Sequence, residues 1–83
     1  MRTLILYGRP DCHLCDEARE MIQPLLVAAG DVEFRDVDIE SNDALFRKYL
    51  ERIPVVELDG SVISELVPDQ RSISAALLHT STR

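Results

Sequence analysis

Apolar and polar positions follow one another along the chain with a period that changes several times. Residues 3–7 form an apolar, β-rich run without polar alternation, and a Gly-Arg-Pro-Asp turn follows it. Such a run is typical of a strand buried on both faces, so we expect a central strand. From Leu14 the period becomes three to four residues, which predicts an amphipathic helix ending near Gly30. Its apolar positions are Leu14, Ala18, Met21, Ile22, Leu25, Leu26 and Ala29.

Both ends of this helix carry sequence signals. Asp11 is the expected N-cap, and Asp16 and Glu17 place negative charge in the first turn, where the helix dipole favours it. Pro24 interrupts the backbone hydrogen bonds of the helix interior. Because the apolar stripe keeps its phase across Pro24, we expect a kinked helix with this proline on the solvent side.

The second half of the chain predicts four further elements. Apolar and charged residues alternate imperfectly in residues 32–39, as in an edge strand. Ser41 and Asn42 offer a cap for a short helix that must end before Pro54. Asp59-Gly60 joins two short β-rich runs, 55–58 and 61–64, as in a type I′ hairpin. Pro68 and Asp69 then open a third helix, whose inward residues are Ile73, Ala76 and Leu77.

The predicted order is therefore β-α-β-α-β-β-α. The first β-α-β unit should be parallel with a right-handed crossover, and the hairpin adds two antiparallel strands. We expect an α/β fold with a mixed four-stranded sheet and helices on both faces. Eighty-three residues support one domain, 1–83, with residues 79–83 frayed.

Charge narrows the choice of partners. The chain has 9 Lys and Arg against 15 Asp and Glu, a formal net charge of -6. Such a chain would repel phosphates, so neither nucleic acid nor an anionic membrane is an expected partner.

The start of the chain lacks the apolar core of a secretory signal, and the two cysteines are too few for a secreted disulfide framework. We therefore expect the reducing cytoplasm as the compartment. We also expect a monomer.

The two cysteines lie where the first strand gives way to the helix. In Cys12-His13-Leu14-Cys15 the sulfurs stand one helical turn apart, close enough to bridge, and free N–H groups of the first turn favour a thiolate. We expect Cys12 to be the exposed nucleophile and Cys15 the buried resolving thiol. Two other interpretations stay open, a permanent structural disulfide and a metal site. The chain offers a metal only His13 and His79 in addition, a poor supply for zinc.

The order of motifs resembles a glutaredoxin, within the wider thioredoxin fold. The resemblance rests on Tyr7-Gly8-Arg9-Pro10-Asp11-Cys12-x-x-Cys15 after a strand and on Ile53-Pro54 before a hairpin, and it runs from about Arg2 to Leu78. It implies that Pro54 is the family's cis-proline, facing the cysteines. It also implies that the Ile53 backbone pairs with a bound thiol peptide.

The resemblance further implies a substrate site. Arg9 corresponds to a basic residue that meets a glutathione carboxylate or steadies the thiolate. Ser64 and Glu65 correspond to a pair that holds the γ-glutamyl end of glutathione. The usual Gly-Gly before that pair is missing, and Asp16 stands where a basic residue is common.

These observations predict a small thiol-disulfide oxidoreductase. Its expected partners are protein disulfides or glutathione mixed disulfides, with no tightly bound cofactor and glutathione as a candidate co-substrate. Two rival functions remain: an iron-sulfur cluster carrier or sensor, with Cys12 as a ligand across a dimer, and a non-catalytic binding module of the thioredoxin fold.

Overall fold

The computed structural model describes residues 2–78 of the chain. The predicted tail, 79–83, and His79 with it, lies outside the described residues. The elements are β1 (Arg2–Gly8), α1 (His13–Ala29), β2 (Val32–Asp38), a 3₁₀ turn (Ile39–Ser41), α2 (Asp43–Tyr49), β3 (Val55–Leu58), β4 (Ser61–Ser64) and α3 (Gln70–Leu78). Their order confirms the predicted β-α-β-α-β-β-α arrangement.

The four strands form one mixed sheet in the order β2-β1-β3-β4. β1 runs parallel to β2 and antiparallel to β3, and β4 pairs antiparallel to β3. The continuous apolar run of β1 therefore lies in the interior of the sheet, and the charged β2 lies at an edge, as their patterns predicted. A register shift between Val56 and Glu57 interrupts the pairing of β3 with β4.

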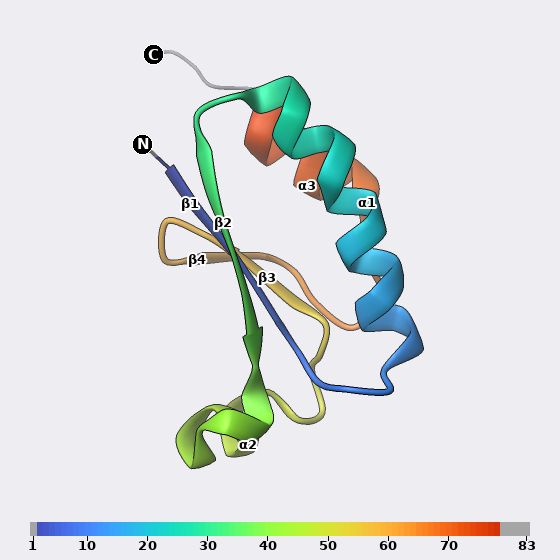
Figure 1. The fold of residues 1–83 in the computed structure, drawn as a ribbon, viewed down its shortest axis with the longest axis vertical. Coiled ribbons are helices and arrows are strands. Elements are labelled where there is room, and N and C mark those ends of the chain that lie inside the picture. Colours follow the sequence, from blue (N-terminus) through green and yellow to red (C-terminus); the bar gives the residue numbers. More distant parts are fainter. Residues whose placement is uncertain (1, 79–83) are drawn as a thin grey trace.

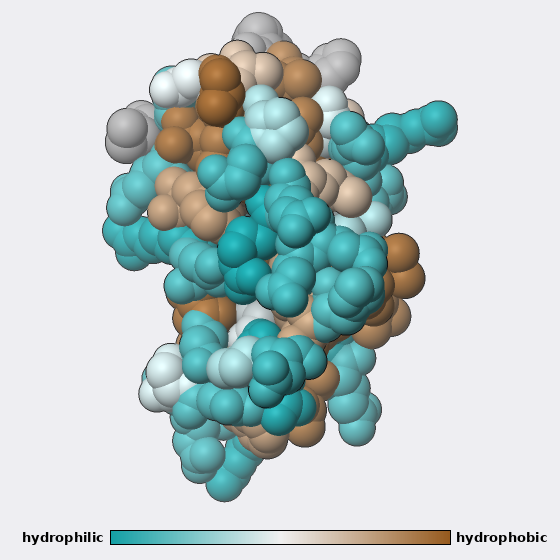
Figure 2. All heavy atoms as spheres, turned by 45° about the vertical axis from the view of Figure 1, so that its right-hand side comes forward, coloured by the Kyte–Doolittle hydropathy of each residue, from teal (hydrophilic) through white to brown (hydrophobic). Residues whose placement is uncertain are grey.

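Two helices cover one face of the sheet, and the third lies at one end of it (Figure 1). α1 and α3 lie side by side on one face and enclose the larger core, which consists of Leu4, Leu6, Ala18, Ile22, Leu25, Val56, Ile73 and Leu77. α2 packs at one end of the other face, where Ile39, Tyr49 and Val55 form a smaller core. Figure 2 shows that the side where α1 lies is largely hydrophilic, with hydrophobic surface towards its margins.

Two expectations about α1 are wrong. The N-cap is Cys12 and not Asp11, which has a positive φ of 60° in the preceding turn. Leu14 is 39% exposed and does not belong to the buried stripe, which starts at Cys15. The stripe keeps its phase through the exposed Pro24, as predicted.

The predicted caps and turns of the second half are present. The Asn42 side chain accepts a hydrogen bond from Leu45 N–H at 3.1 Å and so caps α2. Asp59 and Gly60 have φ values of 49° and 90°, the two positive angles that a type I′ turn requires. Asp69 accepts from Ser72 N–H at 3.2 Å at the start of α3.

Candidate functional site

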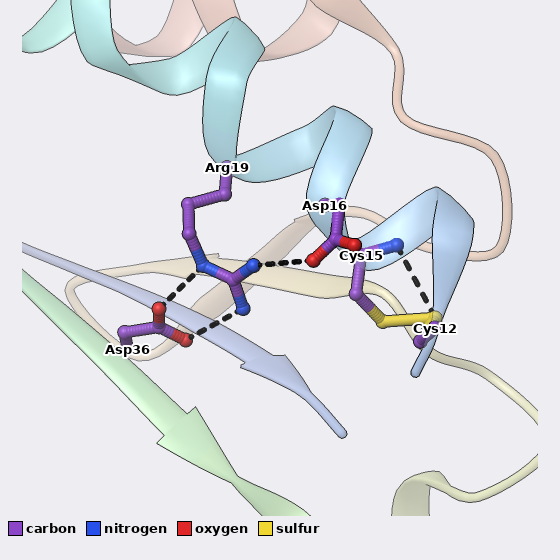
Figure 3. A network of polar contacts seen from close by, with 5 residues as sticks. All are labelled: Cys12, Cys15, Asp16, Arg19 and Asp36. Atoms are coloured by element: carbon purple, nitrogen blue, oxygen red, sulfur yellow. Dashed lines mark hydrogen bonds and ion pairs between the residues drawn. A yellow bond between two sulfur atoms is a disulfide. The ribbon is translucent and has the colours of Figure 1, made fainter. Parts of the chain in front are cut away.

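Cys12 and Cys15 form a disulfide across the first turn of α1 (Figure 3). Their Cα atoms are 5.2 Å apart, within the usual range for a disulfide. Cys15 is fully buried, whereas Cys12 is half-buried, so Cys12 is less exposed than expected but is the more exposed cysteine of the pair.

The cap geometry of Cys12 has a chemical consequence. Cys12 lies in extended backbone, and its Sγ accepts a hydrogen bond from Cys15 N–H at 3.2 Å. This is the position in which an N-cap side chain meets the free N–H groups of a helix. The same groups would stabilise negative charge on the sulfur when the disulfide is opened, since thiolates are favoured at helix N-termini.

Gly8 is a site residue that the sequence analysis missed. A Cβ atom at this position would lie 3.0 Å from Cys15 Sγ and 3.1 Å from Cys15 Cβ. The last residue of β1 must therefore lack a side chain for Cys15 to pack against the sheet. A glycine at the end of a buried strand and four residues before the first cysteine was the only signal for this role.

A charged network lies beside the disulfide (Figure 3). Arg19 donates two hydrogen bonds to Asp36 of β2 and one, of 2.8 Å, to Asp16. The hydrogen bond to Asp36 is the main reason why the pKa of Arg19 lies above its ordinary value. The network joins the first turns of α1 to β2 and adds two negative charges and one positive charge near the sulfurs.

This network borders a pocket of about 320 Å³ between α1, the loop after β1 and the end of β2. The lining residues are Gly8, Arg9, Pro10, Asp16, Arg19, Asp36, Val37 and Asp38. Five of these eight residues are charged, with three carboxylates and two guanidinium groups.

Arg9, an expected substrate-binding residue, already has partners in the protein. Its guanidinium pairs with Glu40 at 2.7 Å and lies 5.9 Å from the centroid of the Phe46 ring. Arg9 therefore borders the cysteine region with its charge matched by a carboxylate. Both members of the pair are partly exposed, so solvent weakens the interaction.

Ile53 and Pro54 lie at the same end of the sheet as the cysteines. Val55 pairs with Tyr7, which places Pro54 beside Gly8 and hence near Cys15. The Ile53–Pro54 peptide bond is cis, and Pro54 is fully buried. The N–H of Ile53 donates to the Tyr49 carbonyl at 3.0 Å, so only the Ile53 carbonyl remains for a bound peptide.

Ser64 and Glu65 are also engaged within the protein. The Ser64 hydroxyl accepts from Asp69 N–H at 3.3 Å, and Glu65 binds Arg52 through two hydrogen bonds of 2.8 and 3.0 Å. The hydrogen bond from Arg52 holds the pKa of Glu65 below its ordinary value. The Arg52 carbonyl also accepts from Leu66 N–H at 2.9 Å.

Arg52 is thus a second residue that the sequence analysis missed. It ties the segment before the cis-proline to the connection between β4 and α3. Ion pairs between segments this far apart in the chain leave no local pattern in the sequence.

Within residues 2–78, no group of three or more His, Cys, Asp or Glu side chains is arranged to hold a metal ion. Over the same range, no helix has the length and apolar character needed to cross a bilayer. His13 is exposed and pairs with Glu17 at 2.9 Å.

The fold and the cysteine pair define a protein of the thioredoxin fold with a Cys-x-x-Cys disulfide, which supports a redox function. The family model "Glutaredoxin-like domain (DUF836)" matches residues 3–79, and the chain belongs to this family. No curated protein sequence matches the chain.

Three solved structures illustrate the similarity. Protein Ne2328 from Nitrosomonas europaea is 31% identical, with a TM-score of 0.77 over 92% of this chain and 91% of its own. Protein XcR50 from X. campestris is 35% identical, with a TM-score of 0.69 over 94% and 99%. The oxidised mitochondrial thioredoxin 3 of Saccharomyces cerevisiae is 17% identical, with a TM-score of 0.73 over 95% and 78%, and shows the shared fold.

Proposed function

We propose that the chain is a thiol-disulfide oxidoreductase that cycles between the Cys12–Cys15 disulfide and the dithiol. The observation that carries the proposal is the asymmetry of the pair. Cys15 is 0% exposed, while Cys12 is partly exposed and its sulfur accepts a hydrogen bond from Cys15 N–H at the start of α1. One sulfur is thus placed to meet a substrate and the other to remain protected until it is needed.

The reaction begins with the Cys12 thiolate attacking a substrate disulfide. A mixed disulfide forms between Cys12 and one substrate sulfur, and the other substrate sulfur leaves as a thiol. Cys15 then attacks Cys12 Sγ, releases the second substrate thiol and restores the internal disulfide. The substrate gains two electrons, and the cysteine pair loses them.

Protein disulfides are the substrates we favour. Arg9 and Glu65, the charged groups that would meet the ends of glutathione, already pair with Glu40 and Arg52. Binding glutathione there would have to replace these pairs.

Apolar surface near the site supports the same choice. Leu66 and Val67 are 51% and 67% exposed, and Figures 1 and 3 draw their connection beside the first turn of α1. An apolar protein segment fits such a surface better than a charged tripeptide does.

Glutathione remains a candidate reductant. We also propose that the protein works in the cytoplasm, as a monomer and without a tightly bound cofactor.

A trapping experiment tests the proposal. Cys15→Ser leaves Cys12 able to form a mixed disulfide that cannot be resolved. After incubation with cell lysate under mild oxidation, mass spectrometry should find particular proteins bound through Cys12, and reductant should release them. Cys12→Ser is the matched control and should bind none.

The outcomes separate the alternatives. Glutathione as the sole adduct would overturn the preference for protein substrates. Absence of any adduct, or equal capture by the Cys12→Ser control, would contradict the redox function itself.

A further inference from the structure

The reactive form of Cys12 carries a charge that the disulfide does not carry. This inference rests on the proposed function, in which Cys12 attacks the substrate. Opening the disulfide to the dithiol adds two electrons and two protons, and loss of the Cys12 proton to solvent leaves a negative charge on its sulfur. This thiolate is the nucleophile. A positive charge held near Cys12 therefore favours the reactive form, and a negative charge opposes it.

Asp16 brings a negative charge to the same helical turn as Cys12. The Asp16 N–H donates to the Cys12 carbonyl at 3.0 Å, so the two residues stand one turn apart at the start of α1. Residues with this spacing are neighbours on a helix, with Cβ atoms about 5–6 Å apart. The Asp16 side chain is 62% exposed, so packing does not fix its direction.

Arg19 gives the Asp16 carboxylate a fixed direction. The guanidinium donates to Asp16 at 2.8 Å and makes two hydrogen bonds to Asp36 of β2. Two such bonds between a guanidinium and a carboxylate set the orientation of both groups, so β2 holds the guanidinium in place. In Figure 3 the Asp16 carboxylate points towards Arg19 and not towards the Cys12 sulfur.

We propose that Arg19 is a positioning residue for the Cys12 nucleophile. It draws the Asp16 carboxylate towards β2 and offsets its negative charge, so that Asp16 opposes the Cys12 thiolate less. Asp36 keeps the guanidinium in place. Arg19 makes and breaks no covalent bond: the thiolate attacks the substrate disulfide as described above, and Arg19 acts on it through Asp16.

The chemistry of the side chain explains why this residue is an arginine. A guanidinium has five N–H donors in a fixed plane and can bind two carboxylates at once, whereas an ammonium is a compact point charge. The side chains of Arg19 and Asp36 are 35% and 40% exposed, so solvent screens the network. Two unit charges about 8 Å apart in water change an equilibrium by about twofold to threefold, and we expect effects of this size.

Other charged side chains lie at the same end of the molecule. Three ion pairs are formed there without Arg19 or Asp16, namely His13–Glu17, Arg9–Glu40 and Arg52–Glu65. Asp11 is exposed in the turn before Cys12, and Asp38 is exposed at the end of β2. These groups are the same in every variant below, so differences between the variants report on the Arg19 network.

The pH dependence of Cys12 alkylation measures how strongly the thiolate is favoured. Iodoacetamide is uncharged, so the network does not steer it, and mass spectrometry locates the adduct on Cys12 of the reduced protein. Arg19→Gln removes the charge and its bonds, and Arg19→Lys keeps the charge alone. Arg35→Gln is the matched control, because Arg35 also pairs with a carboxylate, Glu33, but points to the sheet face opposite to Asp36.

We expect Arg19→Gln to move the midpoint of the alkylation rate upwards by about 0.3–0.5 pH unit, which is the twofold to threefold change given above. Arg19→Lys should lie between this variant and the wild type, and Arg35→Gln should match the wild type. Asp16→Asn should move the midpoint downwards. In the Asp16→Asn background, Arg19→Gln should lose at least half of its effect, because the carboxylate that it positions is gone. High salt should reduce all these shifts.

Three results would overturn the inference. The midpoint of Arg19→Gln could match that of the wild type. Arg19→Gln and Asp16→Asn, which break the same bond, could shift the midpoint in the same direction, as a purely structural effect would. The two shifts could also add fully in the double variant. Urea denaturation shows whether each variant is folded, and Arg19→Lys replaces Arg19→Gln in the comparison if the latter is not.

A parallel reaction separates this inference from the proposed function. The reduced wild-type protein is mixed with 2-hydroxyethyl disulfide, which is uncharged, and the released thiol is measured. We expect the protein to reduce this disulfide and to form its own Cys12–Cys15 bond. A wild-type protein that reduces no disulfide would contradict the proposed function, whereas a reactive wild type whose variants share its midpoint would contradict only the role of Arg19.

Discussion

Replacing Gly8 with alanine tests how closely the cysteine pair is packed against the sheet. The added methyl group would lie 3.0 Å from Cys15 Sγ and 3.1 Å from Cys15 Cβ. Both atoms belong to a fully buried residue at the start of α1, and Gly8 is itself buried at the end of the central strand. The helix and the strand must therefore move apart slightly, or the side chain of Cys15 must shift.

The expected cost follows from two opposing effects. Adding a methyl group to a well-packed core destabilises a protein by about 1–3 kcal/mol. Replacing glycine restricts the unfolded chain, which stabilises the folded state by about 0.4–1 kcal/mol where the backbone allows alanine. The midpoints of the two ranges, about 2 and about 0.7 kcal/mol, give an expected net loss of about 1.3 kcal/mol in the free energy of unfolding.

Urea denaturation of the oxidised protein measures this loss. A double-mutant cycle with Cys12→Ser and Cys15→Ala as the second change identifies its source. Removing the sulfur should relieve part of the cost of Gly8→Ala, with a coupling energy of about 1 kcal/mol. A cost of Gly8→Ala below about 0.5 kcal/mol, the size of a surface substitution, would refute the packing argument.

Three further predictions concern stability. Burial, and then the nearby Glu57 carboxylate, raise the pKa of Tyr7 to about 12. The neutral Tyr7 side chain therefore contributes fully to stability below about pH 10, and this contribution is lost as pH rises towards 12. Tyr7→Phe should reduce that loss when the free energy of unfolding in urea is measured across this pH range. Asn42→Ala should cost about 1 kcal/mol because the cap of α2 is lost, while Asn42→Asp should cost little; equal unfolding midpoints for the two variants would exclude the cap. The hydrogen bond from Arg52 lowers the pKa of Glu65, so this carboxylate stabilises the fold above its ordinary pKa and stops doing so as pH falls through the lowered value. Glu65→Gln should thus be less stable than the wild type at neutral pH and equal to it in strong acid, and a deficit that persists in acid would argue against the ion pair.

The elements that the sequence predicted well are those with a local physical cause. Asp59 and Gly60 were recognised because few residues other than these adopt two successive positive φ angles. The central position of β1 followed from its apolar residues on both faces. The cap at Asn42 likewise needs only the residues of its own turn.

The errors and omissions concern contacts between distant segments. Asp11 is a good N-cap by composition, but the tight turn after β1 gives it a positive φ and moves the cap to Cys12. Leu14 fits the apolar count, yet the buried stripe begins at Cys15, which packs against Gly8 at the end of β1. The Arg52–Glu65 pair depends on two loops that only the folded chain brings together.

A redox titration of the Cys12–Cys15 pair tests the central claim most directly. The protein is equilibrated with a series of dithiol redox buffers, and the fraction of free thiol is measured by mass after alkylation. We predict a reversible two-electron transition with a midpoint between about −180 and −270 mV, the range of dithiol catalysts. A midpoint below about −300 mV, as in structural disulfides, would show that the bond is a permanent staple. A failure of the reduced pair to reoxidise would contradict a reversible redox cycle.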